Sequence, residues 1–218
     1  MRFVVREMAY EKLVVSGRCR LGAAVEQWRL TRAVDGYHIL RVDHDTRPDN
    51  SYLYHLILNP AGEPDRLLFR LFRPGLTVRG NVLFGDGLAL QTRLVNNQSE
   101  QIELDYPAGT YFHFPALVAF SLLRTVPPTD QRCPALTLAK EQLLALQPAT
   151  LRAGLGQLTV EWANQQQTVW LDEMSRPVRW LEHDSLSGST NFADLSNLHE
   201  VKYEKFFPFP FVSPVSRL

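Results

Sequence analysis

Apolar and polar residues alternate along short runs of the chain between residues 24 and 106. In the run 66–73, three apolar residues fall on one side of an extended strand and two arginines fall on the other: Leu67, Phe69 and Leu71 against Arg66 and Arg70. Such alternation is typical of strands with one buried face and one face in water. The segment 24–106 is therefore predicted to be a first antiparallel β meander.

Turn residues separate these runs. They are Asp35-Gly36, Asn59-Pro60-Ala61-Gly62, Gly85-Asp86-Gly87 and Asn96-Asn97. Glycine and asparagine tolerate positive φ, and proline and aspartate favour the start of a turn, so each group predicts a hairpin. Consecutive strands joined by short hairpins are neighbours in space. The predicted sheet is large and curved, with one apolar surface that another element has to cover.

The segment 112–124 abandons the alternation and is apolar on nearly every side. A helix with this pattern is buried. Pro115 suits its first turn, and Pro127-Pro128 would stop it. We therefore expect a buried helix over 112–124 in the hollow of the sheet. The predicted fold is mainly β: a large antiparallel sheet curled into an open or half barrel around one apolar helix.

Strand patterns resume after this segment and predict a second β meander over 134–205. Within it, the stretch 136–146 fits either a helix or a strand. The C-terminal segment 206–218 has two prolines among phenylalanines in its first six residues, 206–211, and cannot be a central strand, so it is interpreted as an extended apolar strap. We expect the whole chain, 1–218, to form a single domain.

Composition narrows the classes of function. The chain has 218 residues, with 23 Lys and Arg against 23 Asp and Glu. This balance argues against a nucleic-acid binder, which normally carries a basic excess. No apolar run is long enough to span a bilayer as a helix. Arg6 and Glu7 interrupt the stretch where a secretory peptide would be apolar, so we expect a cytoplasmic location.

The order of parts, and the segment Trp170-Leu171-Asp172-Glu173-Met174-Ser175-Arg176-Pro177-Val178-Arg179-Trp180, resemble uncharacterised bacterial families. One of these families is labelled as glycolipid-binding, and their sheet curls into a half barrel like that of the lipoprotein-localisation factors. The resemblance covers about residues 24–203. It implies a hydrophobic cavity between sheet and helix that receives an acyl chain or another apolar ligand.

The aromatic residues and arginines supply the candidate binding site. Aromatic side chains with a few polar anchors at the mouth are typical of lipid pockets, and arginine binds carboxylate or phosphate head groups. The predicted ligand-binding residues are Trp28, Tyr52, Tyr54, Phe69, Arg70, Arg79, Phe112, His113, Leu117, Phe120, Trp162 and Trp180. The hypothesis is a non-catalytic binder of a lipid, glycolipid or other amphiphile, with no metal and no cofactor. The same aromatic residues could instead form a plain core.

Two alternatives stay open. One is a structural or protein-interaction module with a packed core, whose outer sheet face or segment 206–211 docks a partner or a second copy in a homodimer. The other is an enzyme that uses His38, His55 or His113, since histidines on neighbouring strands could meet. No spacing of histidines or nucleophiles in the chain matches a known catalytic motif.

Overall fold

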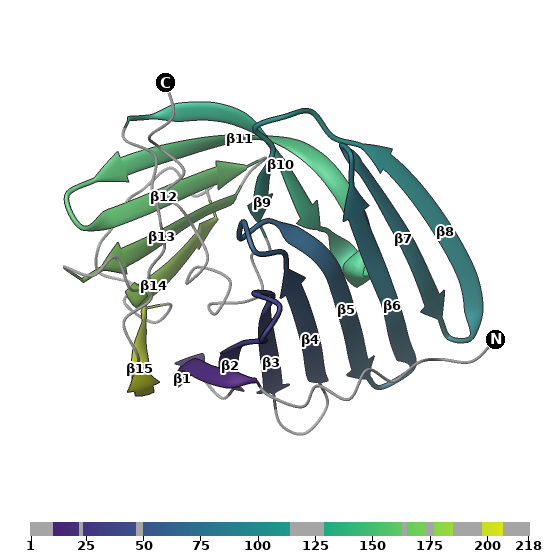
Figure 1. Cartoon of the computed structure of the whole chain (residues 1–218), viewed down its shortest axis with the longest axis horizontal. Coiled ribbons are helices and arrows are strands. Elements are labelled where there is room, and N and C mark those ends of the chain that lie inside the picture. Colours follow the sequence, from purple (N-terminus) through teal and green to yellow (C-terminus); the bar gives the residue numbers. More distant parts are fainter. Residues whose placement is uncertain are drawn as a thin grey trace.

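The computed structural model describes residues 11–21, 24–46, 50–113, 129–162, 165–172, 177–184 and 198–206. This part of the chain is mainly β (Figure 1). The strands are β1 (Lys12–Leu21), β2 (Ala24–Arg32), β3 (His38–Thr46), β4 (Asn50–Leu58), β5 (Pro64–Arg73), β6 (Leu76–Gly85), β7 (Leu88–Val95), β8 (Gln98–Asp105), β9 (Tyr111–His113), β10 (Gln131–Leu138), β11 (Leu144–Gly154), β12 (Gln157–Trp162), β13 (Gln165–Leu171), β14 (Pro177–Asp184) and β15 (Leu198–Phe206). The 3₁₀ helix η2 (Lys140–Gln142) connects β10 to β11.

The strands form two sheets that share β15, and their hydrogen-bonded order is β8-β7-β6-β5-β4-β3-β2-β1-β15-β14-β13-β12-β11-β10-β9. All pairs are antiparallel except β9 with β10, which are parallel. The order ends at β8 and β9, which do not pair with each other in the described ranges, so the strands do not close a barrel. The prediction of a mainly antiparallel β protein is confirmed.

The predicted hairpin turns of the first meander are all present. Gly36, Gly62 and Gly87 have positive φ, as do Asp86, Asn96 and Asn97. In the turn at Asn59, the side-chain Oδ1 accepts hydrogen bonds from the backbone N–H groups of Ala61 and Glu63, at 3.0 Å each. Residues that tolerate the left-handed region thus occupy the four turns that the sequence predicts.

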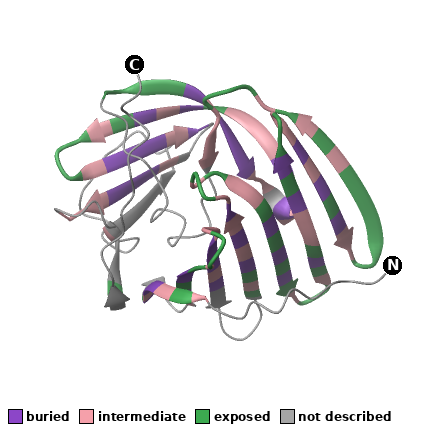
Figure 2. Ribbon diagram, in the orientation of Figure 1, coloured by how far each residue is buried: buried purple, intermediate pink, exposed green. Residues whose placement is uncertain are grey.

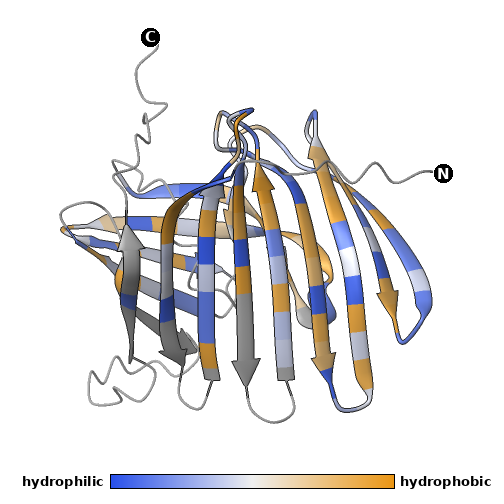
Figure 3. Cartoon of the chain, turned by 60° about the horizontal axis from the view of Figure 1, so that its bottom comes forward, coloured by the Kyte–Doolittle hydropathy of each residue, from blue (hydrophilic) through white to orange (hydrophobic). Residues whose placement is uncertain are grey.

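The alternation of the sequence also places the core. In β5, the apolar residues Leu67, Phe69 and Leu71 are buried, whereas Arg66 and Arg70 are exposed. Figure 2 shows this alternation as buried and exposed bands along the strands, and Figure 3 shows it as hydropathy. The inward face of β1–β8 builds one hydrophobic cluster, and residues of the second meander such as Leu136, Leu144 and Val169 belong to the same cluster.

The expectation of a sheet curled around an apolar helix over 112–124 is wrong. In the described ranges there is no α-helix, and the first two residues of the predicted helix, Phe112 and His113, lie in strand β9. The remainder of the predicted helix, including Leu117 and Phe120, lies outside the described residues. The alternation rule failed here because a short all-apolar run fits a buried strand as well as a buried helix.

The tip of the β10–β11 hairpin packs against the inward face of the first sheet (Figure 1). Tyr54 of β4 donates a hydrogen bond to Oε1 of Gln142 at 2.7 Å. Gln91 of β7 donates to the Gln142 carbonyl at 2.7 Å and accepts from the Leu144 N–H at 3.0 Å. Each partner is buried or nearly so. Buried polar groups need such partners, so these bonds fix where the hairpin tip sits.

Arg93 of β7 adds a charged contact to the same tip. Its guanidinium donates to the Glu141 carbonyl at 2.8 Å and pairs with Glu100 of β8 at 2.6 Å. The backbone of Glu141 and Gln142 lies in the left-handed region, with φ of 57° and 61°. Non-glycine residues adopt this region at a cost. The hydrogen bonds from β4 and β7 offset that cost. The stretch 136–146, which the sequence left between helix and strand, is therefore two strands and a tight turn.

The sequence did not predict strand β1 or its pairing with β15. Gly17 of β1 lies where the two sheets join, and a Cβ there would come within 2.6 Å of the Trp28 ring and 2.7 Å of the Lys202 carbonyl oxygen. Only glycine fits this close approach. The predicted C-terminal strap, 206–218, lies outside the described residues after Phe206.

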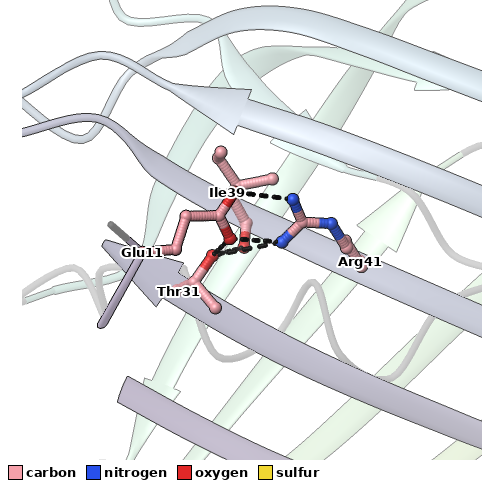
Figure 4. Close-up of polar contacts among 4 residues, drawn as sticks. All are labelled: Glu11, Thr31, Ile39 and Arg41. Atoms are coloured by element: carbon pink, nitrogen blue, oxygen red, sulfur yellow. Dashed lines mark hydrogen bonds and ion pairs between the residues drawn. The ribbon is translucent and has the colours of Figure 1, made fainter. Parts of the chain in front are cut away.

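A cluster of charged and polar side chains ties Glu11, which precedes β1, to the neighbouring strands (Figure 4). Arg41 of β3 contacts both carboxylate oxygens of Glu11, at 2.6 and 2.8 Å, and Thr31 of β2 donates to the same carboxylate at 2.5 Å. The hydrogen bonds from the Arg41 guanidinium are the main reason that the pKa of Glu11 is lowered to about 2. They also raise the pKa of Arg41.

Candidate functional site

Most of the predicted aromatic binding residues are part of the packed core. Trp28, Tyr54 and Phe69 are buried on the inward face, and Tyr52 is half-buried beside them. The rings of Tyr52 and Tyr54 stack with centroids 6.3 Å apart. Burial raises the pKa of Tyr54 far above its usual value, so its hydroxyl remains a neutral donor to Gln142. These residues hold the two meanders together.

Phe112 and Trp162 also pack against other side chains. Phe112 of β9 meets the rings of Phe84 and Tyr106 edge to face, with centroids 5.5 and 5.6 Å away. Trp162, at the end of β12, belongs to a second buried cluster with Cys133 and Ala149. The strand positions of His113 and Trp180 are known, in β9 and β14, but their side chains lie outside what the structure describes, as do Leu117 and Phe120.

Arg70 and Arg79 lie together on the opposite, outward face of the first sheet. They are direct partners across the β5–β6 pair, and both are exposed. Side chains at such positions start about 5 Å apart, and like charges placed directly opposite destabilise a sheet. Within the described ranges neither guanidinium forms an ion pair. The pair therefore presents two positive charges side by side.

A groove of about 350 Å³ surrounds this pair. Leu53 of β4 is the register partner of Arg70, and Leu94 of β7 is the partner of Arg79, so an apolar residue lies on each side of the two arginines. The next row along the strands contains Leu68 and His55. A volume of this size is within the range of small-molecule sites, about 300–1,000 Å³.

The outward faces of β4, β5, β6 and β7 carry no carboxylate. Their residues, read from the alternation and register, are Ser51, Leu53, His55 and Ile57, then Arg66, Leu68, Arg70 and Phe72, then Thr77, Arg79, Asn81 and Leu83, then Leu90, Thr92 and Leu94. Three arginines and several leucines thus share a surface without an acidic residue. Arginine binds carboxylate and phosphate oxygens with two parallel N–H groups, so this surface is suited to an anion that carries an apolar part.

A second, wider groove of about 800 Å³ lies along β10–β12, beside Cys133, Pro134, Pro148 and Trp162. Its charged residues are Arg132 and Glu161, one of each sign. Burial raises the pKa of the Cys133 thiol, so the reactive thiolate is disfavoured there. This groove has no pair of like charges comparable to Arg70 and Arg79.

The structure does not bring His38 and His55 together. His38 lies on the inward face of β3 with Leu40, whereas His55 lies on the outward face of β4 opposite Arg41 and Leu68. Burial, and then the charge of Arg32, lower the pKa of His38 and favour its neutral form. No group of metal-ligating side chains occurs in the ranges that the structure covers. In the same ranges, no helix has the length and apolar character needed to cross a membrane.

The sequence predicted Arg70 and Arg79, whose side chains lie at the groove, but not Leu53, Leu68 and Leu94. Leu53 and Leu68 stand beside polar residues on the outward side of their strands, and Leu94 stands on the outward side of β7, whose inward side carries Gln91 and Arg93. This irregular alternation was the available signal. It could not show which leucine faces which arginine, because that depends on the register between strands.

No family model, curated protein or solved structure matches the chain. The resemblance to glycolipid-binding families therefore stays an expectation from the sequence. The function has to be inferred from the chemistry of the chain's own surface.

Proposed function

We propose that the protein is a non-catalytic binder of an anionic amphiphile, and that the outward groove at Arg70 and Arg79 is its binding site. The anionic head group, a carboxylate or a phosphate, accepts hydrogen bonds from the two guanidinium groups. The apolar tail lies against Leu53, Leu68 and Leu94. This proposal keeps the ligand class expected from the sequence but moves it from the interior of the sheet to its outward face.

The observation that carries the proposal is the cross-strand pair of arginines without a carboxylate partner. Placing two like charges opposite each other costs stability in the unliganded protein. A bound anion removes that repulsion, so binding gains more from a preformed pair than from two separate arginines. The groove also offers apolar contacts beside the charges, which a free inorganic anion would not use.

Isothermal titration calorimetry with dodecyl phosphate tests the proposal. For a ligand of this size we expect a Kd of about 0.1 mM at low salt. Loss of one charged hydrogen-bonding partner in an exposed groove weakens binding by about tenfold, so Arg70→Gln and Arg79→Gln should each raise the Kd by that factor. Dodecyltrimethylammonium, which has the same tail and a positive head, should not bind.

The matched control is Arg152→Gln. Arg152 is also exposed on a strand, but it pairs with Glu161 and lies outside the groove. Its Kd for dodecyl phosphate should equal that of the unchanged protein. Equal binding by the Arg70, Arg79 and Arg152 variants would exclude the groove as the site. No heat of binding with the unchanged protein would exclude the function.

A further inference from the structure

Large apolar side chains are concentrated on the same outward face, beyond the limits of the groove. Six large hydrophobic residues are exposed among those described, and four of them lie here: Leu53, Leu68, Phe72 and Leu83. The other two, Val34 and Leu155, lie in hairpin turns. Phe72 is 55% exposed, which is unusual for an aromatic residue in a strand. The face therefore has more exposed apolar surface than a groove for one small ligand requires.

The charged residues of this face extend beyond the groove in the same way. Arg66 does not line the groove, but it lies on the outward side of β5, two rows from Arg70 in the direction away from Phe72. From Arg66 to Phe72 the surface is about 20 Å long, and from β4 to β7 it is about 14 Å wide. It carries Arg66, Arg70 and Arg79 and no carboxylate. Arginines interspersed with exposed leucine and phenylalanine are the pattern of a surface that rests on an anionic bilayer.

We infer that the outward face of β4–β7 docks on the surface of a membrane that contains anionic lipids. Phe72 and Leu83 insert among the lipid head groups, while Arg66, Arg70 and Arg79 contact lipid phosphates. The acid-free surface is limited to β4–β7, because the next strands place Asp43 opposite Leu53 and Glu103 opposite Leu90. Two copies stacked on the β4–β7 surface would place like-charged arginines against each other, which favours a bilayer over a second copy. The inference shares Arg70 and Arg79 with the proposed function, but it does not rest on it, because it also uses Arg66, Phe72 and Leu83 outside the groove and needs no ligand in the groove.

Vesicle co-sedimentation tests the inference, using phosphatidylcholine vesicles with and without 30 mol% phosphatidylglycerol. The unchanged protein should sediment with the anionic vesicles and stay in solution with neutral ones. Raising the salt from 0.1 to 0.5 M should weaken this binding, because screening reduces contacts between surface charges. Failure to bind the anionic vesicles, or equal binding to both kinds, would overturn the inference.

Single substitutions locate the contact. Arg66→Gln should reduce partitioning onto anionic vesicles about fivefold, the usual effect of one basic residue near such a surface. Phe72→Ser should reduce it about tenfold through lost apolar burial. Arg152→Gln and Leu155→Ser are the controls, since both residues are exposed but belong to the second sheet, Arg152 in β11 and Leu155 in the β11–β12 turn. Equal loss from all four variants would overturn the docking face.

Two further measurements separate this inference from the proposed function. The Arg66→Gln and Phe72→Ser variants should bind dodecyl phosphate as the unchanged protein does, because neither residue lines the groove. If the protein binds vesicles but not dodecyl phosphate, the docking face stands and the groove is excluded as a ligand site. If it binds dodecyl phosphate but not vesicles, only the docking face is excluded. Light scattering after size exclusion should give one chain per particle. A dimer that Phe72→Ser dissociates, without vesicle binding, would assign the face to a second copy and overturn the inference.

Discussion

Replacing Arg93 by methionine removes the guanidinium that ties β7 to the tip of the β10–β11 hairpin. Arg93 is 8% exposed, and its NH1 group donates to the Glu141 carbonyl at 2.8 Å. Its Nε and NH2 groups contact the Glu100 carboxylate at 2.8 and 2.6 Å. Methionine keeps much of the length and apolar bulk of the side chain but cannot donate. The substitution therefore tests how strongly these polar contacts hold the hairpin in the hollow.

The size of the effect follows from the two contacts. A hydrogen bond from a charged donor such as the Arg93 guanidinium contributes about 1.5–3 kcal/mol. The Glu100 side chain is 45% exposed, so its ion pair contributes at most about 1 kcal/mol. Apolar burial of the methionine side chain restores part of the lost stabilisation. We expect Arg93→Met to lower the free energy of unfolding by about 2–3 kcal/mol.

Urea unfolding followed by tryptophan fluorescence measures this change. With a denaturant slope of about 2–3 kcal/mol/M, the midpoint should fall by about 1 M. Arg152→Met is the control, because Arg152 is 56% exposed and its pair with Glu161 faces water. Its unfolding free energy should stay nearly unchanged, because a pair exposed to water contributes little to stability. Equal effects of the two substitutions would refute the anchoring role of Arg93.

Three further substitutions test other parts of the fold by the same urea unfolding. Glu141→Gly should raise the unfolding free energy by about 1 kcal/mol, because φ of Glu141 is 57° and glycine adopts this region without strain; a decrease would contradict the turn geometry. Gly80→Ala should lower the unfolding free energy by about 2 kcal/mol, because the new Cβ would lie 2.5 Å from the Thr92 carbonyl oxygen. Gly85→Ala should leave it unchanged, because no atom lies within 4 Å of the new Cβ. Similar costs at both glycines would contradict this packing. Glu11→Gln should lower the unfolding free energy by about 2 kcal/mol at pH 6, because the pKa of Glu11 is about 2 in the folded protein and 4.5 without its partners. A lowered pKa stabilises the fold above pH 4.5, and that contribution is lost as the pH falls through about 2, so the two proteins should converge in acid. A pH-independent difference would exclude Glu11 as its source.

The strands of the first meander were predictable because each one carries its own local signal. Asn96 and Gly36 mark turns that need positive φ, and both have it. The alternation around Phe69 and Arg70 places one inward and the other outward, as observed. Local propensity and burial agree at these positions, and sequence reasoning is reliable where the two agree.

Long-range features were not predictable. The hairpin that packs on the inward face is held by Tyr54, Gln91 and Arg93, which contact the turn at Glu141 and Gln142 about fifty residues or more away in the sequence. The residues next to these three in the sequence do not indicate that contact. The pairing of Arg70 with Arg79 depends equally on the β5–β6 register. Both arginines could therefore be predicted as anchors from the sequence, but their meeting on the outward face could not.

The most direct test of the binding site observes the two arginines themselves. In a ¹⁵N-labelled sample, the Nε–Hε NMR signals of arginine are followed while dodecyl phosphate is added, and the signals are assigned from the Arg70→Gln, Arg79→Gln and Arg152→Gln variants. A head group held by the cross-strand pair should shift the Arg70 and Arg79 signals together, with one common Kd, and leave Arg152 unmoved. Binding that leaves Arg70 and Arg79 unshifted, or that shifts all arginines alike, would contradict the assignment of this groove as the site.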